Sequence, residues 1–518
     1  MDQDAGPAVP TPQAAVPAVP LAGQGPGSFP DRVPALAWLI AAAFVAVELA
    51  VSGRYGFMQD ELYFVEASRH LAFGYVDQPP LTPLLTRVAE LPGLSPTAIR
   101  IIPALAGGAV VVAAARFAAL FGAGRLGRVL AALTMACTPF LLGADHVDNT
   151  TALDLLAWTV VLLCVTTALL RNRPRWWFGA GVAAGIGLEN NNLMLLLLVA
   201  IGLGVLLSRQ AGALRTRWPW LGAAIAAVIW APNLIWQATH GWPQLAMASV
   251  LHQQNNSAGD YLGGLPAQLL YLGLVGAVLA IAGFIKLWRT PELRFIAVAV
   301  TFVVGYVLAW VPGKVYYTDG VAAAVLAAGS VATERWIGRA RHPRLLRDTV
   351  FAVIVVSTAV ILLTDLPIVP VGDVHKLPAS SQHSAVVGNT VGWPQLVRAV
   401  AAQDAARVRV GQPPTSIFTG YYGEAAALDV LGSADHLPPV LSAHNAYWMW
   451  GPGHASDRTV LVVDALSRLR PYFASCRLLT TYHAPYQVHN DWTPIQIGVC
   501  TGPSAGWHTL WPRLKHYQ

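Results

Sequence analysis

The sequence predicts a polytopic α-helical membrane protein that ends in a small α/β domain. Of its 518 residues, 55% are hydrophobic and only 12% are charged, which is about half the charged fraction of a soluble globular protein. The apolar residues stand in long runs, and short arginine-bearing stretches separate them. The last ~150 residues, enough for one small domain, lack this pattern. The composition argues against a soluble cytoplasmic enzyme. The net charge of +6 implies no nucleic-acid partner, because loop arginines account for it.

Residues 1–32 are rich in Pro, Ala, Gly and Gln and contain no apolar run. Such a segment cannot bury enough apolar surface to fold. It also lacks the basic start and the apolar centre of a signal peptide. We expect a disordered cytoplasmic tail.

Residues 33–367 contain about eleven apolar segments, each long enough to cross a bilayer or nearly so. The fifth and the tenth are short, at about 15 residues against the ~20 that a crossing needs. We expect these segments to form about 11 transmembrane helices. Their centres lie near Ala42, Val111, Leu133, Trp158, Ala183, Leu197, Ala227, Val275, Val300, Ala324 and Val356.

Loop charges predict the orientation, since Lys and Arg accumulate on the cytoplasmic side of short loops. With the N-terminus inside, every inner loop is basic, whereas the outer stretch from His240 to Leu262 contains no Lys or Arg. An odd number of spans places everything after Asp365 outside. We therefore expect a multi-pass plasma-membrane protein with a cytoplasmic N-terminus. The inner loops carry Arg116, Arg125 and Arg128; Arg171, Arg173 and Arg175; Arg209, Arg215 and Arg217; Lys286, Arg289 and Arg294; and Arg335, Arg339, Arg341, Arg344 and Arg347.

Residues 368–518 alternate short β-like runs with helical stretches, which predicts a small extracytoplasmic α/β domain. Cys476 and Cys500 lie in this domain and could form a disulfide if its compartment is oxidising. The β-like runs are Ser416–Thr419, Thr459–Val463, Arg477–Tyr482 and Ile495–Val499, and the helical stretches are Leu396–Ala406 and Glu424–Leu431.

The first outer loop, residues 54–100, is unusually long for a membrane connector, and we expect it to form short helices on the membrane surface. Just after the first span it carries two adjacent carboxylates, Asp60 and Glu61. An isolated acidic pair is most often a solvated turn or a helix N-terminus, where acids are favourable. The pair gains weight here because the other outer loops are also polar.

Those other loops carry acids, amides and histidines in place of basic groups. Each of these side chains taken alone could simply be a solvated loop residue without a function. For Asn190 the preferred interpretation is an exposed turn. Together they predict a hydrophilic cavity, which Glu48 and Asp154 should also face because a charge in hydrocarbon is expensive. The candidates for a sugar or acceptor site are Tyr63, Asp145, His146 and Asn190.

The chemistry of such a cavity follows from what the sequence lacks. There is no Gly-rich phosphate loop, and inner loops of about ten residues cannot build the ~100-residue domain that binds a soluble nucleotide. An activated donor must then be carried by lipid, and a sugar on a polyprenyl phosphate meets this need. One carboxylate would act as base on an acceptor hydroxyl while cationic and phenolic groups hold the phosphate. The candidates for the phosphate are Arg54, Arg69, Lys314, Tyr316 and Tyr317.

Three segments resemble the bacterial branch of glycosyltransferase family 39, the protein O-mannosyltransferase-like enzymes of the GT-C fold, which are related to the lipid A aminoarabinose transferases. They are Asp60-Glu61-Leu62-Tyr63, Gly74-Tyr75-Val76-Asp77-Gln78-Pro79-Pro80-Leu81 and Lys314-Val315-Tyr316-Tyr317. Two C-terminal runs, beginning at Tyr422-Gly423-Glu424 and at His444-Asn445-Ala446, look like those of actinobacterial members. The resemblance implies that Asp60 is the catalytic base, that Glu61 orients acceptor or donor, and that Lys314 and Tyr317 handle the lipid phosphate.

The resemblance also implies a possible divalent metal at Asp77 and His240. Two ligands are few, because zinc normally takes three or four. The preferred interpretation of Asp77 is a cap or turn residue before the rigid Pro79-Pro80 break. Gln78 stands where aminoarabinose transferases often have Lys, so that assignment loses support.

The leading hypothesis is an inverting membrane glycosyltransferase that moves a hexose or pentose from a polyprenyl-phosphate donor to a protein, lipid or glycan hydroxyl on the outer face. Mannose is the sugar that the family implies. One alternative is a secondary transporter, which would show internal repeats and midplane charges that this sequence lacks. The other is a non-catalytic envelope membrane protein, for which Asp60→Asn would leave function intact.

Overall fold

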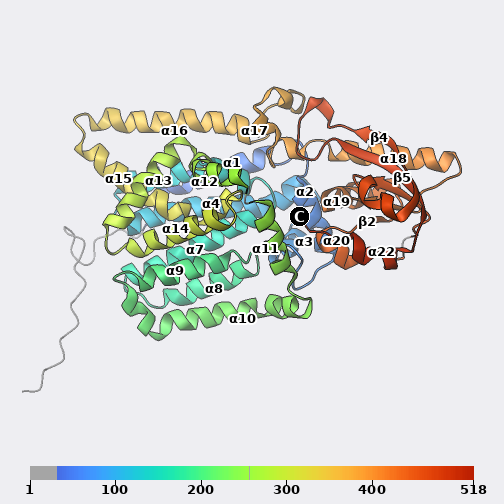
Figure 1. The fold of residues 1–518 in the computed structure, drawn as a ribbon. Coiled ribbons are helices and arrows are strands. Elements are labelled where there is room, and N and C mark those ends of the chain that lie inside the picture. Colours follow the sequence, from blue (N-terminus) through green and yellow to red (C-terminus); the bar gives the residue numbers. More distant parts are fainter. Residues whose placement is uncertain (1–31, 256, 455, 518) are drawn as a thin grey trace, which may run out of the picture. The chain divides into compact units, whose positions relative to one another are not determined.

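The computed structural model describes residues 32–255, 257–454 and 456–517. The expected N-terminal tail lies outside these residues except for Arg32. From Val33 onward the described chain forms one compact unit, with helices first and a sheet near its end. Figure 1 shows the helices on one side of this unit and the sheet on the other.

The helical part contains the predicted apolar segments, and the centre of every one of them lies in a helix. Local sequence sets several of the helix ends: Ser95 caps α4 by accepting a hydrogen bond from the Ala98 amide at 3.1 Å, and Asn149 caps α7. The α-helices are α1 (Ala35–Val51), α4 (Pro96–Leu120), α5 (Arg125–Ala136), α6 (Pro139–Asp145), α7 (Thr150–Leu170), α8 (Trp176–Leu188), α9 (Met194–Leu206), α10 (Arg217–Thr239), α11 (Pro243–Gln254), α12 (Ala258–Tyr271), α13 (Gly273–Arg289), α14 (Arg294–Trp310), α15 (Ala322–Arg339) and α16 (Pro343–Asp365). Two 3-10 helices, η1 (Ala211–Arg215) and η2 (Val315–Val321), lie between them.

Length and composition make four of the described helices, α4, α7, α10 and α16, able to cross a membrane. The number rises to six if the bent pairs α5–α6 and α12–α13 each form one span. The other apolar helices, α1, α8, α9 and α14, are shorter. The fold class is therefore confirmed, while the expected eleven crossings stay a prediction.

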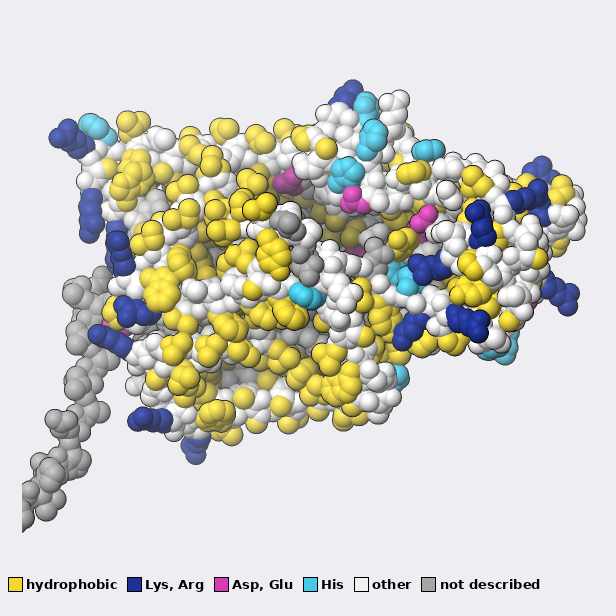
Figure 2. Space-filling view, in the orientation of Figure 1, with side chains coloured by type: hydrophobic (Ala, Val, Ile, Leu, Met, Phe, Trp, Pro, Cys, Tyr) yellow, Lys and Arg dark blue, Asp and Glu magenta, His cyan; other side chains and the backbone are white. Residues whose placement is uncertain are grey.

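Exposed apolar side chains identify the surface that meets lipid. In α16 only 6% of the apolar window is buried, and Val355, Val356 and Val360 are more than half exposed. Figure 2 shows hydrophobic side chains over most of the helical part of this face, with Lys and Arg gathered beyond it at the far end of the helices and over the C-terminal sheet. So large an exposed apolar surface is unstable in water and stable in a bilayer.

The long first loop contains two helices, α2 (Gln59–Arg69) and α3 (Leu81–Ala89). Every residue of α2 from Glu61 to Ser68 is buried, because the C-terminal helix α19 (Tyr422–Leu431) packs against it. The helical expectation for this loop is right, but α2 lies inside the protein and not on a membrane surface.

The C-terminal part is built on a five-stranded sheet in the order β2-β1-β3-β5-β4. β1 pairs in parallel with β2 and β3, whereas β5 runs antiparallel to β3 and β4. The strands are β1 (Ser416–Thr419), β2 (Val440–Ser442), β3 (Thr459–Val463), β4 (Phe473–Tyr482) and β5 (Ile495–Pro503). β2 has three residues and is absent from the predicted strands, since so short a run carries no alternating pattern.

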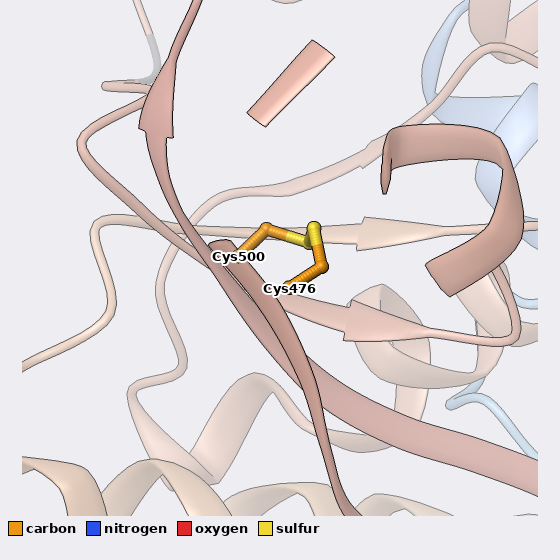
Figure 3. Close-up of a disulfide and its surroundings, with 2 residues drawn as sticks. All are labelled: Cys476 and Cys500. Atoms are coloured by element: carbon orange, nitrogen blue, oxygen red, sulfur yellow. A yellow bond between two sulfur atoms is a disulfide. The ribbon is translucent and has the colours of Figure 1, made fainter. Parts of the chain in front are cut away.

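Helices surround this sheet in the C-terminal part. The α-helices are α17 (Ala379–Gln382), α18 (Trp393–Arg409), α19, α20 (Asn445–Trp450), α21 (Leu466–Leu469) and α22 (Trp507–Leu514). The 3-10 helices are η3 (Val371–Lys376), η4 (Gly388–Thr390), η5 (Ser433–Asp435), η6 (Arg470–Tyr472) and η7 (Pro485–Gln487). A disulfide joins Cys476 to Cys500 across the directly paired positions of β4 and β5 (Figure 3).

Candidate active site

One large cavity, with a volume of about 1240 Å³, lies where the helical part meets the C-terminal part. Its polar wall includes Asp60 of α2, Asp77 of the following loop, and Asn389 and Asp491 of the C-terminal part. A second stretch of the wall is apolar and comes from three helices. These apolar residues are Leu195, Leu196 and Val199 of α9, Met247 and Leu251 of α11, and Phe302, Tyr306 and Trp310 of α14. Val199, Tyr306 and Trp310 are also among the exposed side chains, so this part of the cavity borders the lipid-facing surface.

Asp60 lies in the first turn of α2, at the wall of the cavity. The hydroxyl of Tyr422 donates a hydrogen bond of 2.7 Å to Asp60 Oδ1. Burial raises the pKa of Asp60 above its ordinary value, while the Tyr422 hydrogen bond and the charge of Lys314 act in the opposite direction. Burial in turn lowers the pKa of Lys314, and the charge of Asp60 opposes that shift. The two side chains therefore form a partly desolvated pair of opposite charge.

Asp77 is the second carboxylate of the wall. Its Oδ1 accepts a hydrogen bond of 3.0 Å from the Tyr63 hydroxyl, and its Oδ2 accepts one of 3.3 Å from Asn445 Nδ2. Burial raises the pKa of Asp77 to about 6, and the nearby charge of Asp60 adds to the rise. Each carboxylate is thus held by its own tyrosine, and the rings of Tyr63 and Tyr422 lie 4.7 Å apart.

Two of these groups come from the C-terminal part. Tyr422 begins α19 and Asn445 begins α20, and the packing of α19 against α2 brings Tyr422 to Asp60. Sequence reasoning did not assign either residue to the site. The signal was present, since both lie in the runs that look like actinobacterial family members.

Glu61 points away from the cavity, although it adjoins Asp60. It is fully buried and forms an ion pair with Arg100, at 2.6 Å between Oε2 and Nη2. Glu61 also accepts hydrogen bonds from the backbone amides of Met58, at 2.7 Å, and Asp148, at 2.9 Å. The structure thus gives Glu61 a role in fixing the start of α2, in place of the predicted contact with acceptor or donor.

The predicted sugar or acceptor residues are placed mostly behind the wall. Asn190 is buried and not exposed in a turn. Its Oδ1 accepts a hydrogen bond of 2.7 Å from the Thr82 hydroxyl, and its Nδ2 donates one to the Thr150 carbonyl. Its neighbours Asn191 and Asn192 line the cavity instead.

Asp145 and His146 are also buried and absent from the cavity wall. His146 Nδ1 contacts Glu48 Oε2 at 2.7 Å inside the helical part, and neither residue of this pair lines the cavity that Glu48 was expected to face. Asp154, in contrast, does line the cavity as expected.

The predicted phosphate ligands divide into two groups. Tyr316 and Tyr317 line the cavity, and Lys314 lies just before them, close enough to interact electrostatically with Asp60. Arg54 instead donates to the Ile368 carbonyl at 2.6 Å, and Arg69 pairs with Glu66 at 2.9 Å. Neither arginine is placed at the cavity, because each is held by a partner elsewhere.

The proposed metal ligands lie in different surroundings. Asp77 is bound by Tyr63 and Asn445, while His240 stacks on Trp236 with ring centroids 4.2 Å apart. Within residues 32–255, 257–454 and 456–517, no group of three or more His, Cys, Asp or Glu side chains could hold a metal ion. The described residues thus give the pair no third ligand.

Comparisons with known proteins concern the family and the fold of the chain. The family model described as dolichyl-phosphate-mannose-protein mannosyltransferase matches residues 77–236. The crystal structure of ArnT from Cupriavidus metallidurans in the apo state is similar with a TM-score of 0.60 and 14% identity, over 89% of this chain and 97% of that one. ArnT from the same organism bound to undecaprenyl phosphate gives a TM-score of 0.55 and 16% identity over the same shares. No curated protein matches the chain in sequence. The chain therefore has the GT-C fold of the ArnT structures, and residues 77–236 within it match the protein mannosyltransferase family model.

Proposed function

We propose that the protein transfers one sugar from a polyprenyl-phosphate donor to an acceptor hydroxyl, with Asp60 as the catalytic base and with inversion at the anomeric carbon. The observation that carries the proposal is the position of Asp60 at the wall of the cavity, with Oδ1 held by Tyr422. Within the described residues Asp60 Oδ2 has no hydrogen-bond partner, so it is available to take the proton from the hydroxyl group of the acceptor substrate.

The electrostatics of Asp60 suit a base. A pKa raised from its ordinary value makes a carboxylate a stronger proton acceptor, provided that it stays ionised at the working pH. Tyr422 and Lys314 both favour the ionised form and so oppose complete neutralisation by burial. Asp77, beside it, would hold a hydroxyl group of the sugar or acceptor by accepting its proton in a hydrogen bond.

The apolar stretch of the cavity supports a lipid-borne donor. Side chains of α9, α11 and α14 line it next to the lipid-facing surface, so a polyprenyl chain can enter from the bilayer without crossing water. The related ArnT structure holds undecaprenyl phosphate. Lys314, Tyr316 and Tyr317 are the groups we assign to the donor phosphate, as a charge and two hydroxyl donors. Mannose is the sugar we propose, because the matching family model describes mannosyl transfer to proteins.

The orientation and the division of the chain belong to the same proposal. We place the N-terminus in the cytoplasm, residues 33–367 in the membrane and residues 368–518 outside. Support comes from the basic inner loops and from the gathering of Lys and Arg at the helix ends far from the sheet (Figure 2).

The decisive experiment uses purified full-length protein in detergent with radiolabelled polyprenyl-phosphate mannose and an envelope extract as acceptor source. Asp60→Asn should reduce transfer by at least about 100-fold, the usual contribution of a general base. Asp348→Asn changes an exposed acid in α16 that pairs with Arg347; it is the matched control and should retain full transfer. Undiminished transfer by Asp60→Asn would remove this residue from the mechanism.

A further inference from the structure

A second cavity lies in the C-terminal part, with a volume of about 490 Å³. It is lined by Gly420, Tyr421, Asp464, Ser467 and Arg468, none of which lines the large cavity. The proposed transfer reaction uses none of these residues.

The place of this cavity in the sheet is that of a ligand site in many α/β proteins. Gly420 and Tyr421 directly follow β1, and Asp464 directly follows β3, so the cavity lies at the carboxyl ends of two adjacent parallel strands. From β1 the chain goes first to β2 on one side and then to β3 on the other. Ligands bind outside the carboxyl ends of strands at such a change of direction, because the two connections diverge and leave a crevice.

The backbone at the cavity is adapted to keep the two strand ends close. A Cβ atom on Gly420 would lie 2.4 Å from the Asp464 carbonyl oxygen, so only glycine fits there. Asp464 itself adopts a φ of +51°, a left-handed conformation that an aspartate adopts only at some cost in energy. Strain of this kind is concentrated at functional positions.

The two charged side chains of the cavity, Asp464 and Arg468, lie near each other but do not form an ion pair. Asp464 and Arg468 are both half-buried and influence each other electrostatically. Yet within the described part of the chain neither side chain makes an ion pair or a hydrogen bond. Half-buried charged groups without partners are costly, so a bound group that accepts from the guanidinium and donates to the carboxylate would be stabilised.

Few kinds of ligand present both functions side by side. A phosphate would satisfy Arg468 but would be repelled by Asp464, and an apolar molecule would satisfy neither. Two neighbouring hydroxyl groups of a sugar ring can accept from the arginine and donate to the aspartate at once. The Tyr421 ring, 37% exposed, offers a flat apolar surface for the C–H face of the same ring.

We propose that this cavity is a carbohydrate-binding site, in which Arg468 and Asp464 bind adjacent hydroxyl groups of one sugar unit and Tyr421 packs against its ring. The site is separate from the large cavity and does not depend on the proposed transfer reaction. The two sites are adjacent in sequence at one point, since Tyr421 of the carbohydrate site directly precedes Tyr422, which holds Asp60.

The test uses saturation-transfer NMR and calorimetric titration of the full-length protein in detergent. The probes are methyl mannoside, methyl glucoside, methyl galactoside and mannobiose, with inorganic phosphate and a threonine tripeptide as competing ligand classes. We expect at least one saccharide to bind. Arg468→Gln and Asp464→Asn should each weaken that binding about tenfold or more, because each removes one charged hydrogen-bonding partner.

Controls separate this site from the catalytic one. Arg470→Gln changes an exposed arginine outside the cavity and should leave binding unchanged. Asp60→Asn should also leave it unchanged, so failure of the transfer proposal and failure of this one give different results. Arg468→Lys keeps the charge and loses the planar fork, and it should bind about tenfold less tightly even if Arg468→Gln does not fold.

Three results would overturn the proposal. They are the absence of binding by every saccharide, equal binding by the Arg468 and Asp464 variants, and binding of phosphate or the tripeptide in place of the sugars.

Discussion

The Tyr422 hydroxyl donates a 2.7 Å hydrogen bond to Asp60 Oδ1, across 362 residues of sequence. Asp60 belongs to the first loop after α1, and Tyr422 to the sheet-containing C-terminal part. The geometry of the proposed base therefore depends on contact between the two parts of the protein. The predictions below begin with this contact.

Tyr422→Phe removes that hydrogen bond and keeps the ring. Because the bond favours the ionised form of Asp60, its loss should raise the Asp60 pKa further and weaken the positioning of the base. We expect kcat/KM at neutral pH to fall roughly tenfold, the usual effect of losing a hydrogen bond to a charged group. The acid limb of the pH profile should move to higher pH. Tyr472→Phe, which alters a tyrosine in η6 that lines neither cavity, is the control and should change neither quantity.

Substitutions of Lys314 and Asp77 should shift the acid limb of the pH–activity profile in opposite directions. Lys314→Gln removes a positive charge that lowers the Asp60 pKa, so the limb should move to higher pH and the KM for the donor should rise. Asp77→Asn removes a negative charge beside Asp60. The Asp60 pKa should therefore fall, and the acid limb of the pH profile should move to lower pH. In the unaltered protein, activity should decline as the pH falls through about 6, where the Asp77 carboxylate is protonated. Initial rates measured between pH 4.5 and pH 9 test all three statements. This range extends roughly two units to each side of neutrality and covers the pH values at which these carboxylates should titrate. Shifts in the same direction would contradict them.

Removal of one partner from the Glu61–Arg100 pair should destabilise the protein strongly. Both side chains are almost fully buried, so Arg100→Met leaves a buried carboxylate without its counter-charge. The expected loss is about 3–5 kcal/mol of unfolding free energy. Replacing both, as Glu61→Leu with Arg100→Met, should cost less than either single change. Thermal unfolding in detergent measures the three variants, and additive losses would contradict the assignment.

The disulfide should contribute to stability independently of the catalytic site. Cys476 and Cys500 are separated by 24 residues, and closing a loop of this length stabilises a protein by about 3.5 kcal/mol. Cys500→Ser should therefore lower the unfolding temperature of the C-terminal part, and reductant should have the same effect on the unaltered protein. Cys137→Ser, which changes a free cysteine, should make no difference to the response to reductant.

The proposed orientation predicts which engineered thiols are accessible from outside. In a variant without its free cysteines, Arg409→Cys on α18 should react with a membrane-impermeant maleimide in intact cells. Arg344→Cys, in the first turn of α16 at the basic end of that helix, should react only after the membrane is opened. The reverse pattern would invert the orientation.

The helical fold was predictable because lipid imposes a strong local requirement. A segment that crosses a bilayer must be apolar over most of its length, and this pattern is visible without any knowledge of contacts. The centre of each predicted segment accordingly lies in a helix. The number of crossings is harder to derive, since bent pairs such as α12 and α13 interrupt single runs.

The site was only partly predictable, for a physical reason that differs between residues. Asp60 could be singled out because the acids, amides and histidines of the other outer loops gave weight to the acidic pair that follows the first apolar helix. Arg69 was misplaced because charge alone does not name a partner, although Glu66 stands three residues earlier, the spacing of neighbours on one helix face. The contacts of Tyr422 and Arg54 join distant segments, and no local pattern encodes such contacts.

The location of Tyr422 and Asn445 after the last apolar helix has a consequence for biosynthesis. Once the ribosome has translated α16 but has not yet reached Tyr422, all the helices from α1 to α16 have been made, but the nascent chain still lacks the Tyr422 hydroxyl that holds Asp60. In the proposed mechanism Asp60 is thus positioned for catalysis only late, when the terminal segment has been delivered and has docked, which would keep half-made molecules from acting on a lipid-linked sugar donor.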